Sequence, residues 1–426
     1  MHGRESAVSV LDANRRDGYT IPSATLYPFQ WNWDSAFVAV GLAHADPAAA
    51  KREIRTLLDA RWENGMVPQI AFWSDAAGYF PGPEEWRVGA DRTAHADVET
   101  SGITQPPMVA LAAEYVYEMT GDESFRDSVL PDLKAHCEWW LRERSDDGEL
   151  VWVRHPWATG MDDSPAWVGP LERFDPGDVS YVRKDRKDDD LAEQRPTDWD
   201  YDRYVALVRQ GRELDWDEAR LRKESPFVVE DVLTNALFAR ACGSVAALSA
   251  DAGDDAAAER WRAQAETTRR ALSERRFDDD LGLFVSHDLV ADEPLPVRSV
   301  AGLLPTLAGA PTDDQFERMR ETLADFFAYE YAAPSYVGPE MDYDRYWRGP
   351  VWLNTNWLLE RGLRRMGAER EADRIRADSR RLLDREGFRE YFNPETGSGR
   401  GSDRFSWSAA LSLTWAGDDA PTEVAR

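Results

Sequence analysis

Three segments of the chain place acidic side chains beside aromatic rings, at points where a helical pattern begins or stops. They read FQWNWDS at residues 29–35, WATGMDDSP at residues 157–165 and REYFNPETG at residues 389–397. A carboxyl group packed against apolar rings keeps its proton near neutral pH, as a general acid requires. Flat aromatic faces also suit the apolar face of a sugar ring. The three segments therefore indicate acid–base chemistry on a carbohydrate.

Each of these acids also has a purely structural interpretation. Asp34 could be the N-cap of a helix, a position that favours Asp. Asp162 and Asp163 could accept hydrogen bonds from the amides of their own turn, and residue types alone favour that interpretation. Glu390 lies in a strand-like segment, where a single Glu is more often exposed than catalytic. Both interpretations stay open at this point.

Tryptophan is abundant in this chain. The sequence has 18 Trp beside 14 Tyr and 16 Phe, more than core packing demands. A Trp-rich core explains Trp139 and Trp140 on a helix. It does not explain the tryptophans in polar, Gly/Pro-rich segments, namely Trp31, Trp33, Trp73, Trp86, Trp157, Trp347 and Trp352. These predict an aromatic cleft of the kind that binds sugars.

The elements that must position these residues are mainly helices. Short connections alternate with long Gly/Pro/Trp-rich ones, and no internal repeat is detectable. This pattern predicts an all-α fold, an (α/α)6 barrel with its long loops and minor β-strands at the active-site end. The predicted helices span residues 34–44, 47–62, 99–119, 122–144, 226–250, 254–275, 297–307, 312–327, 346–366, 368–385 and 405–415. The predicted strands span residues 150–153, 283–285 and 388–392.

No linker divides the chain, so residues 1–426 are expected to form a single catalytic domain. The least regular stretch, at about residues 174–224, includes a predicted helix over 201–212. Long insertions of this kind often cover active sites as lids. We therefore expect a lid-like insertion there.

The composition excludes several classes of partner. Lys+Arg total 51 against 79 Asp+Glu, a net charge of −28, and only 5 of the cations are lysines. A surface this acidic repels phosphate backbones, so no nucleic-acid partner is expected. The same balance is typical of salt-adapted proteins, although an acidic mesophilic protein is an alternative.

No stretch approaches the roughly 20 apolar residues of a membrane span and no signal core is visible, so we expect a cytoplasmic protein without a membrane partner. The sequence is also compatible with a homo-oligomer.

Metal and cofactor chemistry have no support in the sequence. The two cysteines, Cys137 and Cys242, both lie in apolar helical patterns and are expected to be buried thiols. No two of the six histidines have the spacing of a metal-ligand pair. We therefore expect neither a metal nor a cofactor.

Four motifs together resemble glycoside hydrolase family 63 and its mannosylglycerate and glucosylglycerate hydrolase relatives. They are FQWNWDSAF, the GMDDSP loop, YWRGPVWLNTNW, and EYFNPETG with the FSW that follows it. They occur in the family's order, and the resemblance spans residues 11–415. It implies an (α/α)6 barrel that hydrolyses α-glycosides with inversion and needs no metal.

The resemblance also implies a role for individual residues. Asp162 would be the general acid and Glu390 the general base, with Asp163 and Glu395 as weaker rivals. Inverting enzymes hold these carboxyls about 6.5–9.5 Å apart, so that a water fits between base and sugar. The substrate-binding residues would be Tyr27, Trp31, Trp33, Asp34, Trp157, Gly160, Trp347, Arg348 and Trp352. Tyr79, Gln105 and Arg195 would hold the leaving group.

The expected substrate is a small α-glucoside or α-mannoside, with glucosylglycerate and mannosylglycerate as the leading candidates. Arg195 could grip the carboxylate of such an aglycone in bidentate fashion, or it could pair with neighbouring acids. A neutral α-glucosidase or trehalase-like enzyme on the same fold is an alternative. A non-catalytic sugar-binding protein with an aromatic cleft is an alternative of another class.

Overall fold

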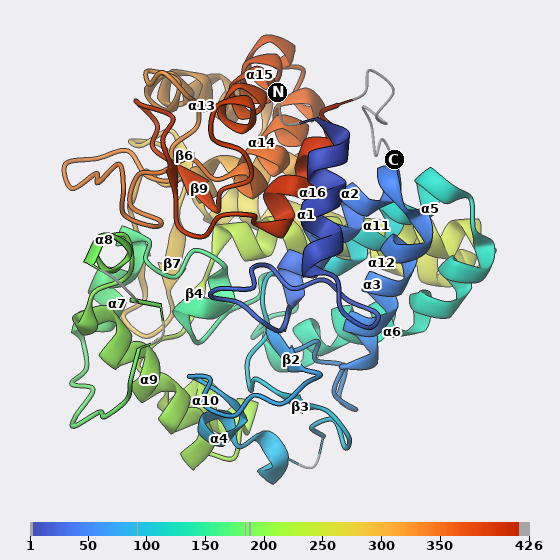
Figure 1. Ribbon diagram of the computed structural model, residues 1–426, viewed down its shortest axis with the longest axis vertical. Coiled ribbons are helices and arrows are strands. Elements are labelled where there is room, and N and C mark those ends of the chain that lie inside the picture. The colour runs from blue at the N-terminus through green and yellow to red at the C-terminus, as the bar shows by residue number, and fades with distance from the viewer. Residues whose placement is uncertain (1–2, 92, 184, 187–188, 417–426) are drawn as a thin grey trace.

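Inner helices form a closed ring in the computed structural model, which describes residues 3–91, 93–183, 185–186 and 189–416. Each inner helix packs on the next one along the chain, and the last packs on the first. These helices are α2 (Asn32–Ala45), α5 (Val109–Thr120), α11 (Val232–Asp251), the 3₁₀ helix η4 (Val300–Ala308), α14 (Leu353–Arg365) and α16 (Ser406–Thr414). The predicted (α/α)6 barrel is confirmed (Figure 1).

A second layer of helices surrounds this ring and packs on the inner helices, with some outer helices, such as α6 (Glu123–Glu143), contacting two of them. Side-chain caps define where several of them begin: Asp46, Asp122, Asp254 and Thr312 each accept a hydrogen bond from the backbone N–H three residues on. The outer helices, in chain order, are α1 (Arg4–Asn14), α3 (Pro47–Asp59), α6 (Glu123–Glu143), α12 (Asp255–Arg275), α13 (Asp313–Phe326) and α15 (Glu369–Glu386). They pack on α16, α2, α5, α11, η4 and α14 respectively.

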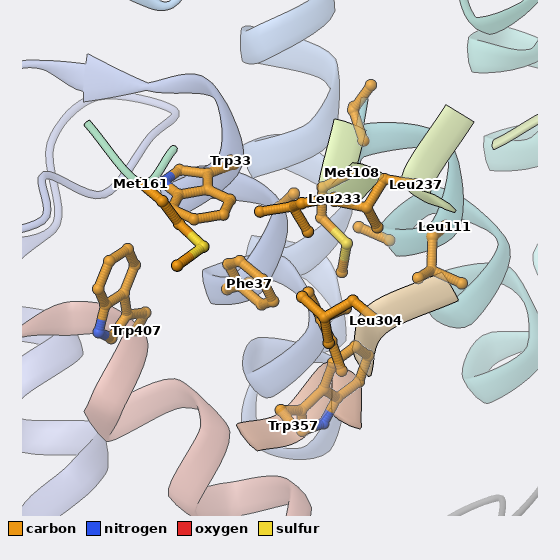
Figure 2. Close-up of a cluster of buried hydrophobic side chains, with 14 of the residues drawn as sticks. Trp33, Phe37, Met108, Leu111, Met161, Leu233, Leu237, Leu304, Trp357 and Trp407 are labelled. Atoms are coloured by element: carbon orange, nitrogen blue, oxygen red, sulfur yellow. The ribbon is translucent and has the colours of Figure 1, made fainter. Parts of the chain in front are cut away.

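Large apolar side chains of the inner helices fill the centre of the ring (Figure 2). Helix α11 is long and apolar enough to cross a membrane by composition, contrary to the expectation that no stretch would be. However, 89% of the most apolar 18-residue stretch of this helix is buried inside the fold. Its high hydropathy is therefore that of a central core helix. Cys137 and Cys242 are buried free thiols, as expected.

The loops at one end of the ring carry short strands. Strand β1 (Gln30–Trp31) pairs with β2 (Ile70–Phe72), which pairs with β3 (Glu99–Thr100). The other strands are β4 (Val229–Glu230), β5 (Phe277–Asp278), β6 (Leu283–Phe284), β7 (Ser286–Asp288), β8 (Glu293–Leu295), β9 (Tyr391–Phe392) and β10 (Gly399–Arg400). The strands predicted at 283–285 and 388–392 are present as the shorter strands β6 and β9. The third, at residues 150–153, makes only an isolated bridge to β4.

Several predicted helices begin later than the apolar pattern suggested. The helix expected at 99–119 begins at Val109, because Pro106 and Pro107 interrupt it. The helix expected at 346–366 begins at Leu353, after the Gly349–Pro350 turn. Helix α1 was not predicted, because its charged residues obscure a short buried face.

The irregular stretch at 174–224 lies to one side of the ring (Figure 1). It contains α8 (Asp189–Glu193), α9 (Asp198–Glu213) and α10 (Glu218–Glu224), next to α7 (Val168–Glu172) and α4 (Pro83–Trp86). Helix α9 covers the helix predicted at 201–212 and begins with a capping box between Thr197 and Asp200.

Candidate active site

A cavity of about 490 Å³ opens where α2, α14 and α16 begin. The long loops bring almost all of the predicted site residues to its wall. Those that line it are Tyr27, Trp31, Trp33, Asp34, Tyr79, Gln105, Trp157, Gly160, Asp162, Arg195, Trp347, Trp352 and Glu390. Arg348 is absent from this wall, and its place is described below.

Stacked indoles form one side of the cavity. The rings of Trp347 and Trp352 are parallel with centroids 3.8 Å apart, and Tyr391 continues the stack at 4.5 Å. Trp33 faces this stack, with its centroid 6.3 Å from Trp347. Of the tryptophans that a core did not explain, Trp73 lies off the wall, where it donates a hydrogen bond to Gln30. The other six line the cavity. Five of them, Trp31, Trp33, Trp86, Trp347 and Trp352, are at most 6% exposed and belong to the hydrophobic core, so the prediction that core packing does not explain them is wrong.

Asp34 does not cap α2. The N-cap position is Trp31, and Asp34 is the third helical residue. Its carboxyl lines the cavity and is only 5% exposed. Burial raises the pKa of Asp34 well above its usual range, and the charge of Glu390 adds to this. The N-cap interpretation is wrong, and Asp34 is a cavity carboxyl.

The loop of Asp162 is held by hydrogen bonds to its backbone. Trp167 Nε1 donates to the carbonyl of Met161 at 2.8 Å, and the Tyr204 hydroxyl donates to that of Asp162 at 2.6 Å. Gly160 precedes them with φ +75°, and a Cβ there would lie 2.6 Å from the Trp33 ring. Only glycine permits this approach. The carboxyl of Asp162 therefore reaches the cavity from a fixed backbone.

Burial, followed by the charge of Asp163, raises the pKa of Asp162 to about 8. Within the described part of the chain, no side chain donates a hydrogen bond to this carboxyl. It is therefore protonated at neutral pH.

Asp163 is turned away from the cavity. Its carboxylate accepts hydrogen bonds from Arg345 at 3.0 and 3.1 Å and from Arg348 at 3.1 Å. Arg345 also contacts Asp200 at 3.0 Å. Arg348 therefore lies behind the wall on an ion pair, which differs from its predicted place in the sugar subsite. Of the two adjacent acids, the one that faces the cavity is Asp162.

Glu390 lies across the cavity from this network, immediately before β9. It is 1% exposed, so the expectation of an exposed side chain is wrong. Its carboxylate accepts hydrogen bonds from Tyr27, Arg195 and the backbone N–H of Ser402. Gly401 has φ +63°, and a Cβ there would lie 2.4 Å from Glu390 Oε2. The rival Glu395 is exposed on its turn.

Arg195 comes from the insertion and is buried. Its guanidinium forms an ion pair with Glu390 at 2.9 Å and lies over the rings of Tyr27 and Tyr346. The alternative that Arg195 pairs with a neighbouring acid is therefore what the structure contains, although that acid, Glu390, is 195 residues away in the sequence.

Sequence reasoning missed several lining residues. Tyr346 and Trp407 lie inside motifs that were recognised, YWRGP and FSW, so their motif membership was the available signal. Phe29 likewise lies inside the motif FQWNWDSAF. Others, such as Gln69, Asp75 and Asp185, carry no distinctive local pattern.

Comparison with known proteins gives a consistent result. Residues 27–408 match the family model of the mannosylglycerate hydrolase MGH1-like glycoside hydrolase domain. The chain belongs to this family. It is 40% identical over 420 residues to a mannosylglycerate hydrolase of Thermus thermophilus, covering 96% of this chain and 99% of that protein. A glucosylglycerate hydrolase of Mycolicibacterium hassiacum is 33% identical over 450 residues, covering 96% and 97%.

A solved structure agrees with the sequence relatives. The family 63 mannosylglycerate hydrolase from Thermus thermophilus, in complex with Tris and D-glycerate, superposes with a TM-score of 0.89 at 39% identity, covering 97% of this chain and 100% of that one. The enzyme is thus an inverting glycoside hydrolase, as the four motifs implied. The alternative of a non-catalytic sugar-binding protein is set aside.

Proposed function

We propose that this enzyme hydrolyses the α-glycosidic bond between glucose or mannose and a small hydroxy acid, with mannosylglycerate and glucosylglycerate as its substrates. One observation carries the proposal. Among the described residues that line the cavity, Arg195 is the one cation, in a wall that holds the five acids Asp34, Asp75, Asp162, Asp185 and Glu390. Arg195 pairs with Glu390 in the free enzyme, and its guanidinium can also bind an aglycone carboxylate, which a neutral substrate lacks.

The acid and base roles follow from the two environments. Asp162 holds its proton at neutral pH and donates it to the glycosidic oxygen as that bond breaks. Glu390, hydrogen-bonded as a carboxylate, takes a proton from water, whose oxygen bonds to the anomeric carbon from the opposite face. The products are a sugar of inverted configuration and the free hydroxy acid.

The neighbouring residues support binding of both halves of the substrate. Trp352 lies between Trp347 and Tyr391, so the outer face of Trp347 is the one left for the sugar ring, and Asp34 is placed to bond its hydroxyls. Tyr79 and Gln105 line the same cavity as Arg195 and complete the site for the hydroxy acid. The volume of about 490 Å³ suits a small glycoside.

A release assay over α-linked substrates tests the proposal. The panel contains mannosylglycerate, glucosylglycerate, their neutral glycerol counterparts, trehalose, kojibiose and nigerose. We expect cleavage of a glycerate glycoside, with kcat/KM about 10–100-fold above that of its glycerol counterpart, because charged hydrogen bonds contribute about 1.5–3 kcal/mol. Proton NMR early in the reaction should detect the β anomer first. Preference for trehalose, or release of the α anomer first, contradicts the proposal.

A further inference from the structure

The base Glu390 has no free acceptor position in this structure. Oε1 accepts from the Tyr27 hydroxyl at 3.0 Å and from Arg195 Nη1 at 3.3 Å. Oε2 accepts from Arg195 Nη2 at 2.9 Å and from the N–H of Ser402 at 2.9 Å. A carboxylate offers about four lone-pair sites, and these four contacts fill them. A water to be deprotonated needs one of these sites, so one contact must open.

Of the three donors, Arg195 is the one that can leave. The Ser402 N–H is held in place because the backbone N–H of Glu390 donates to the carbonyl of Ser402 at 2.9 Å. Tyr27 is half-buried, and its ring packs against those of Trp31 and Phe405. The Arg195 contact to Oε1 is the longest of the four, and its Nε has no hydrogen-bond partner. Nη1 also donates to the Tyr27 hydroxyl at 2.7 Å. The guanidinium therefore holds the base mainly through Nη2 on Oε2, makes its weakest contact at Oε1, and has unused binding capacity at Nε.

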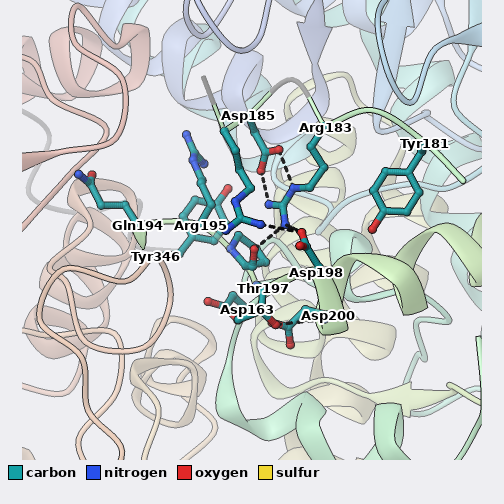
Figure 3. A network of polar contacts seen from close by, with 12 residues as sticks. Asp163, Tyr181, Arg183, Asp185, Gln194, Arg195, Thr197, Asp198, Asp200 and Tyr346 are labelled. Atoms are coloured by element: carbon teal, nitrogen blue, oxygen red, sulfur yellow. Dashed lines mark hydrogen bonds and ion pairs between the residues drawn. The ribbon is translucent and has the colours of Figure 1, made fainter. Parts of the chain in front are cut away.

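The backbone that carries Arg195 is fixed close by, so only its side chain needs to move. Thr197, two residues on, donates a hydrogen bond to Asp200 (Figure 3). Arg345 links Asp200 to Asp163 beside the acid. This network ties the insertion to the loop of Asp162. The guanidinium can then turn between partners without displacing the wall.

We propose that Arg195 is a latch on the catalytic base that the substrate's own carboxylate opens. In the free enzyme the guanidinium covers Glu390. A hydroxy-acid aglycone draws it away from Oε1, and that oxygen becomes free to accept a water. This inference rests on the proposed function, and it adds that the negative charge of the aglycone controls kcat as well as binding.

The latch makes a prediction that binding alone does not. An α-glycosyl fluoride has a leaving group too small to fill the aglycone site, so a free carboxylate can bind there during turnover. Added glycolate or D-glycerate should then open the latch and accelerate hydrolysis of α-mannosyl or α-glucosyl fluoride. If the open state is a minor one of 0.1–10%, saturating carboxylate raises kcat at least about tenfold. If Arg195 served only to bind the aglycone, the added acid would leave the rate unchanged or lower it.

The experiment measures fluoride release against glycolate concentration at constant ionic strength, with glycerol as the neutral control. Arg195→Gln should abolish the activation, while Arg220→Gln, which removes an exposed cation from the same insertion, should keep it. Binding of glycolate and D-glycerate is checked by the thermal shift of each protein. Inhibition, no effect at saturating acid, or no binding up to high millimolar acid overturns the latch. If fluoride hydrolysis is activated but no glycerate glycoside is cleaved, the latch stands and the proposed substrate fails.

Discussion

The two carboxyls of the cavity occupy opposite environments. Asp162 receives no hydrogen bond from a described side chain, and its pKa rises to about 8 through burial and the charge of Asp163. Glu390 accepts hydrogen bonds on both oxygens, including two from Arg195. Burial alone favours a neutral carboxyl, whereas burial with a paired guanidinium and amide favours a carboxylate. Two carboxyl groups of the same chemical kind thereby take different roles, Asp162 as a proton donor and Glu390 as a proton acceptor.

The sharpest test of this division exchanges each carboxyl for its amide. Asp162→Asn and Glu390→Gln keep shape but remove proton transfer, which typically costs about 10²–10⁴-fold in rate. We expect each variant to lose at least that much kcat on the preferred glycoside. Glu395→Gln, which changes an exposed carboxyl three residues beyond β9, is the matched control and should retain full activity. An active Asp162→Asn beside an inactive Asp163→Asn would move the acid by one residue.

Stability separates lost chemistry from misfolding in these variants. The native Asp162 keeps its proton up to about pH 8, whereas an unfolded Asp loses it near about pH 4. The wild-type enzyme therefore loses stability as pH rises through this window. Asn cannot ionise, so the Asp162→Asn protein should melt no lower than wild type at pH 7–8. A large drop in its Tm would attribute the lost activity to misfolding.

A second prediction concerns the charge beside the acid. Asp162 must be protonated to act, so kcat/KM of the wild type should fall as pH rises through about 8. The charge of Asp163 contributes to that raised pKa. In Asp163→Asn the fall should therefore begin at a lower pH. The variant also removes one carboxylate partner of Arg345 and Arg348, which leaves them only Asp200, at 3.0 and 3.9 Å, so a loss of stability is expected as well. An unchanged alkaline limb would show that burial alone sets the pKa of Asp162.

The sequence predicted the helical ring and most of the cavity because both leave local signals. Apolar periodicity and side-chain caps mark α3, α6 and α12, and Trp347 and Trp352 stand out in a polar segment. The short strands β1 to β3 leave no such signal, since two or three paired residues are too few for a pattern. A sequence motif also does not show which way each of its side chains points, because that depends on contacts with distant parts of the chain.

Arg348 and Arg195 illustrate this limit. Both were expected to face the substrate, yet one neutralises Asp163 behind the wall and the other covers Glu390. Pairing between residues almost 200 positions apart depends on how the helices close into a ring, and a short stretch of sequence gives no information about that.

The smallest expected effect distinguishes surface charge from the charges around the acid. With a net charge of −28, repulsion among surface carboxylates should weaken as the Debye length falls from about 10 Å at 0.1 M salt to about 3 Å at 1 M. The Tm should then rise, by roughly 1 °C for each kcal/mol of relieved repulsion in a chain of this length. The carboxyls of Asp162 and Asp163 interact inside the fold, where salt screens them much less. The alkaline limb of the pH profile should therefore stay in place while Tm increases. A Tm that does not rise would remove the salt-adaptation proposal, and a limb that moves with salt would mean that the surface charge sets the pKa of the acid.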